Sequence, residues 1–201
     1  MRFNQRHWVF GLFLLALAGC ATQSPTEKSP DTASTIPTTL TPGEAKNYRD
    51  ALARIEQNDA GKAISSLKKL TQAHPGQPGL WLNLAIAQYQ DQRLDDAKAT
   101  LAYVQNLNGD IAEAHNLAGL IAVDQGDYSA AEKSYRTALK LNQHFADAHY
   151  NLALLYDIFY QDINQAVEHY QRYLALTQEE DKATSAWVEE LKLTLKRRGE
   201  G

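Results

Sequence analysis

Hydrophobic and polar positions repeat along most of the chain. Polar turns each end in an alanine, and three of these alanines, Ala63, Ala97 and Ala131, are 34 residues apart. The turns separate segments whose apolar residues are spaced as on one side of an α-helix. The period divides the chain into four blocks of paired amphipathic helices: 44–77, 78–111, 112–145 and 146–180. A fixed period of this length predicts an all-α fold, an α-solenoid of helix-turn-helix units.

Side-chain size follows the same period. Position 8 of each block is small, position 20 is alanine and position 24 is large. The small residues are Ala51, Ala85, Gly119 and Ala153, and the large ones are Leu67, Leu101, Tyr135 and Tyr170. A large side chain fills the space that a small one leaves, so we expect two helices to cross closely at these positions. The fourth block has one extra residue around 160–164, which moves its alanine to Ala166.

A further helix is predicted after the last block, over residues 181–198. It has one helical stripe of apolar residues, at Ala183, Trp187, Val188, Leu191 and Leu195. The last repeat of a stack needs a cover with a polar outer face. We therefore expect a capping helix here, with Trp187 as its main contact.

The block pattern resembles the tetratricopeptide-repeat (TPR) family. Block 112–145 resembles it best, with Gln-Gly-Asp-Tyr (125–128) at the turn between its helices. The resemblance implies about four TPR repeats over 44–180 with a capping helix, and a concave groove lined by the first helix of each repeat. The groove residues that it implies are Tyr48, Leu52, Leu82, Ile86, Tyr89, Asn116, Leu120, Val123, Asp124, Tyr150, Leu154 and Asp157.

The implied groove has an apolar centre and acidic edges. Such a surface suits an amphipathic or extended peptide with apolar anchors and some basic residues. The family's clamp for a C-terminal carboxylate is not matched, because none of the groove positions is basic. Two occupants stay open: an external protein partner and the chain's own terminal helix.

The composition and the absence of known motifs argue against several classes of function. With 20 basic and 24 acidic residues and a net charge of −4, the chain does not suit a sequence-independent nucleic-acid binder. A single cysteine excludes a disulfide framework and a CxxC metal or redox site. The sequence has no nucleophile elbow, zinc-protease motif or glycine-rich phosphate loop. We therefore expect no enzyme activity, catalytic residue, metal, cofactor or small-molecule substrate.

His115 and His149 occupy position 4 of the third and fourth blocks. Equivalent positions on successive repeats are too far apart for two ligands on one ion, since each metal–nitrogen bond is only ~2 Å long. We expect both histidines to be packing residues.

The first residues carry a targeting pattern. Arg2 and Arg6 precede the apolar segment 8–16, and small residues follow. This order indicates a bacterial secretory signal peptide. An uncleaved anchor is the alternative, but the apolar segment is far shorter than the ~20 residues that a membrane-spanning helix needs.

The end of this segment, Leu-Ala-Gly-Cys (17–20), resembles the lipobox of bacterial lipoproteins. The resemblance implies a signal peptide at 1–19 and attachment of lipid, with palmitate among its acyl chains, at Cys20. Ala21, in place of aspartate, implies sorting to the outer membrane.

Residues 20–43 have the composition of a linker. Between 21 and 43 there are ten Ser or Thr residues and four of the six prolines, with no aromatic residue. Such a segment buries too little apolar surface to offset the entropy of ordering it, so we expect a disordered tether.

Taken together, these features resemble outer-membrane TPR lipoproteins, such as the type IV pilus biogenesis lipoproteins (secretin pilotins). They are also similar to adaptor lipoproteins for cell-wall hydrolases and to repeat proteins of proton-channel envelope motors. The resemblance implies a lipid-anchored scaffold on the periplasmic face of the outer membrane that binds envelope proteins through its groove. An envelope enzyme is the least favoured alternative.

Overall fold

The computed structural model describes residues 35–178 and 180–200. These ranges contain helices and turns and no β-strand. The elements are α1 (Pro42–Glu56), α2 (Ala60–Ala73), α3 (Pro78–Gln90), α4 (Leu94–Leu107), α5 (Ala112–Asp124), α6 (Tyr128–Leu141), α7 (Ala146–Leu154), the π-helix η2 (Leu155–Tyr160), α8 (Ile163–Leu176) and α9 (Lys182–Arg198). The predicted signal peptide, Cys20 and most of the predicted linker lie outside the described residues.

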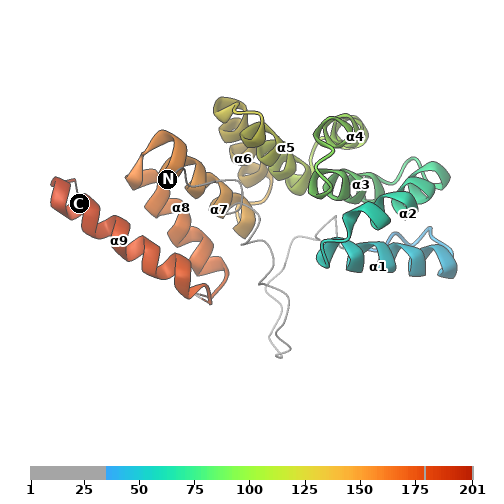
Figure 1. Ribbon diagram of the computed structural model, residues 1–201, viewed down its shortest axis with the longest axis horizontal. Coiled ribbons are helices and arrows are strands. Elements are labelled where there is room, and N and C mark those ends of the chain that lie inside the picture. The colour runs from blue at the N-terminus through green and yellow to red at the C-terminus, as the bar shows by residue number, and fades with distance from the viewer. Residues whose placement is uncertain (1–34, 179, 201) are drawn as a thin grey trace, which may run out of the picture.

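The helices pack in consecutive pairs. α1 packs on α2, α3 on α4, α5 on α6 and α7 on α8, while each pair packs on the next and α9 packs on α8. The pairs form a curved array with α1 at one end and α9 at the other (Figure 1). The predicted all-α solenoid of four helix-turn-helix units with a closing helix is confirmed. Within the described residues, no helix combines the length and apolar character needed to cross a bilayer.

The predicted size pattern sets the spacing within each pair. A Cβ atom at Gly119 would overlap the ring of Tyr135, which is itself 1% exposed. The position-20 alanines are also fully buried: Ala63, Ala97, Ala131 and Ala166. α5 and α6 therefore approach more closely than a side chain at residue 119 permits.

The extra residue of the fourth block is absorbed as a π-helix. α7 continues directly into η2, whose wider turn accommodates one residue more than an α-helical turn. The segment ends at Gln161 in the left-handed conformation (φ 55°), and the Asp162 N–H donates to the Tyr156 carbonyl at 3.0 Å. As a result Ile158, Phe159 and Tyr160 are exposed at the end of this helix.

The array begins earlier than the predicted boundary at residue 43. Thr41 caps α1: its N–H donates to Glu44 Oε2 at 2.9 Å, and the Glu44 N–H donates to Thr41 Oγ1 at 3.3 Å. Ile36 and Leu40 pack against the first hydrophobic core. The predicted linker is therefore wrong at its C-terminal end, because a capping box and two apolar contacts order these residues.

The role predicted for Trp187 is also wrong. α9 contacts the array through one buried face, formed by Thr184, Val188, Leu191 and Leu195. Trp187 is 47% exposed. It lies at the edge of this buried face, where its indole N–H donates to Asp157 Oδ2 at 2.7 Å while much of the ring stays exposed.

In three blocks, position 4 is an aromatic residue whose ring N–H forms a hydrogen bond with the loop that precedes its helix. Trp81, His115 and His149 each donate from a ring nitrogen to a carbonyl six residues earlier. The three acceptors are the carbonyls of Pro75 at 2.9 Å, Gly109 at 2.9 Å and Gln143 at 3.2 Å. The prediction that both histidines are packing residues agrees with these bonds.

His149 also contacts a second histidine. Because its Nε2 donates to the Gln143 carbonyl, its Nδ1 accepts from the Nδ1–H of His169 on α8, at 2.9 Å. Burial lowers the pKa of both rings, that of His169 to about 4. The two histidines therefore join α7 to α8 as a neutral pair. Within the described residues, no three metal-ligating side chains gather at one point.

Candidate partner-binding surface

One predicted groove position is apolar and half-buried in every block. Position 9 lies on the first helix of each pair, and the four side chains are 34 residues apart: Leu52 on α1, Ile86 on α3, Leu120 on α5 and Leu154 on α7. Val123, also half-buried, lies one turn after Leu120 on α5. We call these five residues the apolar strip. It runs across consecutive helices that contact one another, α1 to α3, α3 to α5 and α5 to α7.

Three predicted groove residues at position 5 are buried inside the stack. Tyr48 and Leu82 are 0% exposed and Asn116 is 5% exposed. A partner cannot reach them, so their assignment to the groove is wrong.

Position 5 is buried because it packs on position 6 of the next block. Asn83 Nδ2 donates to the Tyr48 hydroxyl at 2.7 Å, which joins α3 to α1. Asn151 Nδ2 donates to Asn116 Oδ1 at 3.0 Å, which joins α7 to α5 in the same way. In the second and third blocks the same two positions are Leu82 and Leu117, which lie in one hydrophobic core instead of forming a hydrogen bond.

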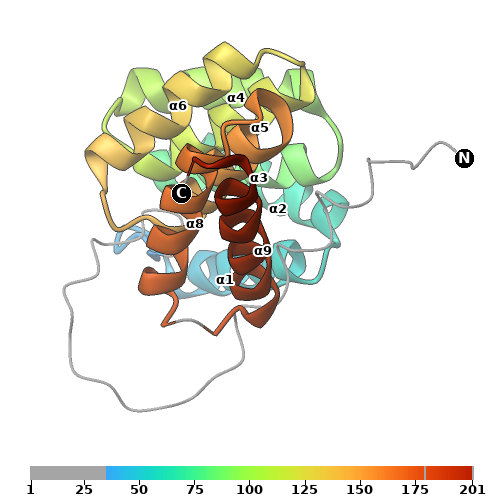
Figure 2. The ribbon, with the colours of Figure 1, turned by 90° about the vertical axis from the view of Figure 1, so that its left-hand side faces the viewer.

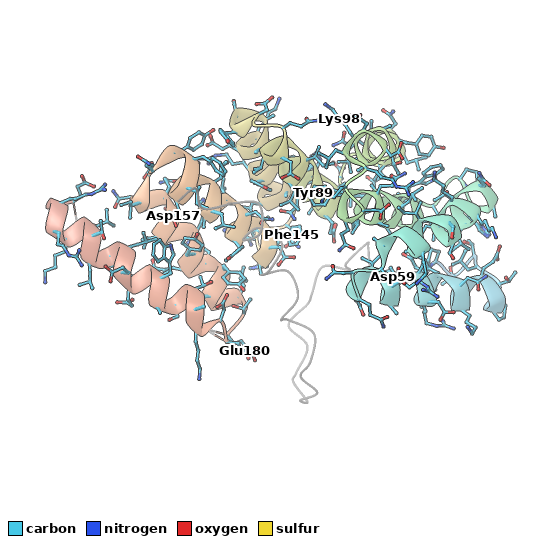
Figure 3. The ribbon with its side chains drawn as sticks, in the orientation of Figure 1. Asp59, Tyr89, Lys98, Phe145, Asp157 and Glu180 are labelled. Carbon is cyan, nitrogen blue, oxygen red and sulfur yellow. The ribbon has the colours of Figure 1, made fainter. Side chains whose placement is uncertain are left out.

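Tyr89 belongs mainly to the interior. It is 9% exposed, and burial, followed by the negative charge of Asp124, raises its pKa. A hydrogen bond to the Asp124 carboxylate contributes to the shift. Asp124 is exposed, and its carboxylate bonds Tyr89, which lies near the middle of the array (Figure 3). This acid therefore holds Tyr89 as well as facing solvent.

Of two further predicted residues, Asp157 lies toward the α9 end of the array (Figure 3), and Tyr150 lies on α7. Both are half-buried. The Tyr150 ring packs against Tyr173 with centroids 4.9 Å apart. Asp157 Oδ2 accepts from the Trp187 indole N–H at 2.7 Å and from the Tyr170 hydroxyl at 3.3 Å. These partners were not predicted from the sequence, because they come from helices that only the tertiary fold brings together.

The terminal helix does not lie along the apolar strip. α9 packs on α8 and continues the stack beyond it. The view from the α9 end shows this helix in front of the array, at its end (Figure 2). Within the described residues, α9 therefore does not extend along the strip.

A depression of about 420 Å³ lies elsewhere, over α6. Its lining consists of Ser129, Glu132, Lys133, Arg136, Thr137 and Lys140. All six residues belong to one helix, so the depression has no opposing wall and cannot enclose a ligand.

The strip and its neighbours offer binding rather than chemistry. Apolar side chains contribute contact area, and the carboxylates of Asp124 and Asp157 accept hydrogen bonds and attract positive charge.

Comparison with known proteins identifies the repeats. A tetratricopeptide-repeat family model matches residues 54–121, and a TPR-repeat model matches residues 119–157. Human superkiller complex protein 3 is 31% identical over 108 residues, which are 53% of this chain and 7% of that protein. The chain thus spans a small part of this relative.

Solved structures share the fold. TTC0263, a thermophilic TPR protein from Thermus thermophilus, has a TM-score of 0.66 at 21% identity, covering 75% of this chain and 81% of that one. A MamA fragment from Desulfovibrio magneticus RS-1 has a TM-score of 0.57 at 16% identity, covering 81% and 100%. YrrB, described as a TPR protein with an unusual peptide-binding site, has a TM-score of 0.56 at 16% identity, covering 73% and 74%. TPR folds are generally non-enzymatic scaffolds, and the comparisons indicate no catalytic family.

Proposed function

Since this chain is a TPR-repeat protein, of a kind that acts in protein–protein interaction, we propose that it is a lipid-anchored scaffold for envelope assembly. The single observation that carries the proposal is the apolar strip. Four successive repeats each place an aliphatic side chain at position 9, half-buried and on helices that contact one another. A row of partly exposed apolar side chains that continues across successive repeats is typical of a binding surface.

The partner is a segment of another protein that lies across the first helices. Apolar contacts with the strip supply most of the affinity, because burial of aliphatic surface is the main favourable contribution at such interfaces. The carboxylates of Asp124 and Asp157 set orientation and association rate. The peptide-binding site of YrrB, a protein of the same fold, supports this kind of ligand.

The sequence supports a membrane anchor for the array. A basic head, the apolar segment 8–16 and Leu-Ala-Gly-Cys direct export and lipidation at Cys20. Each buried methylene of an acyl chain contributes ~0.8 kcal/mol, so several chains on one residue hold the protein at a membrane. Ala21 directs it to the periplasmic face of the outer membrane, where assembly of a type IV pilus or secretin is one instance of the proposed role.

The test is a matched pair of double variants. I86A/L120A removes two adjacent members of the strip, and L107A/L141A removes two exposed leucines from the second helices of the same repeats. Partners are crosslinked in detergent-solubilised envelope and quantified by mass spectrometry. We expect I86A/L120A to lower capture about tenfold or more, since few residues dominate an interface, while L107A/L141A stays near wild type.

Both variants must keep the wild-type circular dichroism spectrum. Equal capture by wild type and I86A/L120A would show that partners bind elsewhere, and the proposal would be wrong.

A further inference from the structure

The junction between α7 and α9 differs from the other junctions of first helices. α1 and α3, α3 and α5, and α5 and α7 each approach within 8 Å between Cα atoms. α7 and α9, both fully described, have no Cα atoms this close. Tyr150 is consequently half-buried, although its position-5 equivalents in the other blocks are buried.

Aromatic side chains line this wider junction. The Tyr150 ring contacts Tyr173 at 4.9 Å and Tyr170 at 5.8 Å between centroids. Trp187 reaches from α9 to η2, where its indole N–H donates to Asp157 at 2.7 Å. The indole is 47% exposed while its nitrogen is anchored, so the ring is fixed in orientation and open to a ligand. Tyr150, Tyr173, Trp187, Asp157 and Asp181 are called the junction cluster.

Both carboxylates of the junction cluster are held by neutral donors. Asp181 accepts from the Tyr173 hydroxyl at 3.2 Å and from the Thr184 hydroxyl at 2.7 Å. Burial acts to raise the pKa of Asp181, but the hydrogen bonds from Thr184 and Tyr173 outweigh it and lower that pKa. Within the described residues, neither Asp157 nor Asp181 forms an ion pair with a lysine or an arginine. The cluster thus holds two carboxylates that are hydrogen-bonded but lack a lysine or arginine partner among the described residues.

The tyrosine hydroxyls respond to this charge. Burial, followed by the negative charge of Asp181, raises the pKa of Tyr173 and of Tyr150. Burial, followed by the negative charge of Asp157, raises the pKa of Tyr170. A cation placed beside Asp157 or Asp181 is therefore stabilised by the charge of that carboxylate.

We propose that the junction cluster binds an arginine side chain of the segment that occupies the apolar strip, an inference that rests on the proposed function. A guanidinium stacks on an aromatic face and donates hydrogen bonds to carboxylates in the plane of its fork. The cluster provides the exposed indole of Trp187, the half-buried ring of Tyr150 and two carboxylates. Leu154 of the strip lies one turn from Tyr150 on α7, so the two surfaces are continuous.

Other ligand classes do not suit the cluster. A phosphate or carboxylate is repelled by Asp157 and Asp181. A purely apolar side chain would desolvate the two carboxylates without compensating them. A basic side chain beside Asp157 compensates that carboxylate and covers the exposed indole that bonds it.

The first experiment uses two peptides that differ only in charge. N-acetyl-Leu-Arg-Leu-amide and its citrulline analogue have nearly the same shape, but citrulline is neutral. Each is titrated into the ¹⁵N-labelled full-length chain, and the indole N–H resonance of Trp187, assigned with W187F, is followed. We expect the arginine peptide to shift this resonance and the citrulline peptide to bind about tenfold more weakly, since only arginine is a cation. Trp81, which donates to Pro75 in the second repeat, is the internal control and should not shift.

The second experiment removes the charges and keeps the structure. D157N retains an oxygen that accepts from Trp187, and D181N retains an N-cap residue for α9. D95N, an exposed aspartate in the first turn of α4, makes the same change of charge elsewhere. We expect D157N and D181N each to weaken the arginine peptide about five- to tenfold, and D95N to leave it within about twofold.

The outcomes separate this inference from the proposed function. The arginine site is overturned if the arginine and citrulline peptides bind equally well. It is also overturned if the double variant D157N/D181N binds the arginine peptide as tightly as the wild type does. If I86A/L120A loses envelope partners while D157N/D181N captures them at the wild-type level, the strip is supported and the arginine site is wrong. If both variants lose partners and the Trp187 resonance responds only to arginine, both proposals are supported.

Discussion

At the scale of the residue, single side chains join neighbouring repeats. Asn83 bonds Tyr48 and Asn151 bonds Asn116, in each case from position 6 of one block to position 5 of the block before it. A buried amide without a partner is costly, so these bonds favour one register of the stack over any other. The register that brings them together also aligns the position-9 side chains into a strip.

The Gly119–Tyr135 contact predicts a clear response to overpacking. G119A places a methyl group against a ring that is 1% exposed and has no room to move. We expect a loss of about 1–3 kcal/mol in the free energy of unfolding, measured by urea denaturation. G43A, where an added Cβ meets no atom within 4 Å at the start of α1, should be neutral or stabilising. An unchanged midpoint for G119A would contradict the packing described here.

The His149–His169 pair predicts loss of stability in mild acid. Burial lowers the folded-state pKa of both rings below the ordinary value of 6.5, that of His169 to about 4. The unfolded chain therefore binds protons first as the pH falls below 6.5, so the stabilisation is complete above that pH and declines toward pH 4. His144, Arg136 and Arg172 add to the lowering, and Glu168 opposes it.

The measurement is urea denaturation at pH 7 and pH 5. We expect the wild type to lose about 1–3 kcal/mol between these pH values, and H169Q to lose markedly less, since glutamine can donate to His149 without titrating. An equal pH dependence in both proteins would assign the acid sensitivity to other groups.

At the scale of the element, irregular helix ends decide what is exposed. η2 adds a residue to the end of α7, which leaves Ile158, Phe159 and Tyr160 at the surface and places Asp157 opposite Trp187. A regular 34-residue block would have continued α7 as an α-helix and changed the side that Asp157 faces. The junction cluster therefore depends on the extra residue of the fourth block.

The start of α1 predicts a second element-scale effect. T41A removes the hydroxyl that accepts from the Glu44 N–H, and with it half of the capping box. We expect a loss of about 1 kcal/mol in the free energy of unfolding, which is typical of an N-cap threonine. Q77A is the matched control, because Gln77 precedes α3 without a side-chain cap bond. If T41A and Q77A cost the same, the cap does not stabilise α1.

At the scale of the whole molecule, the array is built from contacts between neighbouring elements. Each pair packs on the next, and α1 and α9 lie at opposite ends (Figure 1). A stack of this kind presents a long surface without a central cavity, which suits an extended partner better than a small molecule.

The proposed anchor makes a prediction for the full chain in cells. C20S removes the thiol that accepts the lipid while the polar hydroxyl keeps a similar size. We expect the variant to lose label from an alkynyl palmitate analogue and to move from the membrane fraction to the soluble periplasmic fraction, because the acyl chains supply the membrane affinity. Labelled C20S that stays in the membrane would show that Cys20 is not the lipid site.

The repeat architecture could be predicted from the sequence because its cause is local. Alanine at position 20, a small residue at position 8 and a large one at position 24 recur with a fixed period, and each acts within one pair of helices. Such short-range constraints appear directly in the sequence pattern. Position 9 of the predicted groove has the same property, since a leucine or isoleucine recurs there in every block.

Only the tertiary structure decided which groove residues a partner can reach. Tyr48, Leu82 and Asn116 have the period of a surface position, but each packs on a residue about 35 positions later in the chain. The junction cluster likewise joins Tyr150, Asp157 and Trp187 from three elements, through an irregular turn whose shape one inserted residue sets. Burial and pairing between distant residues depend on how helices are spaced in three dimensions, and that spacing is a property of the packed array rather than of any single repeat.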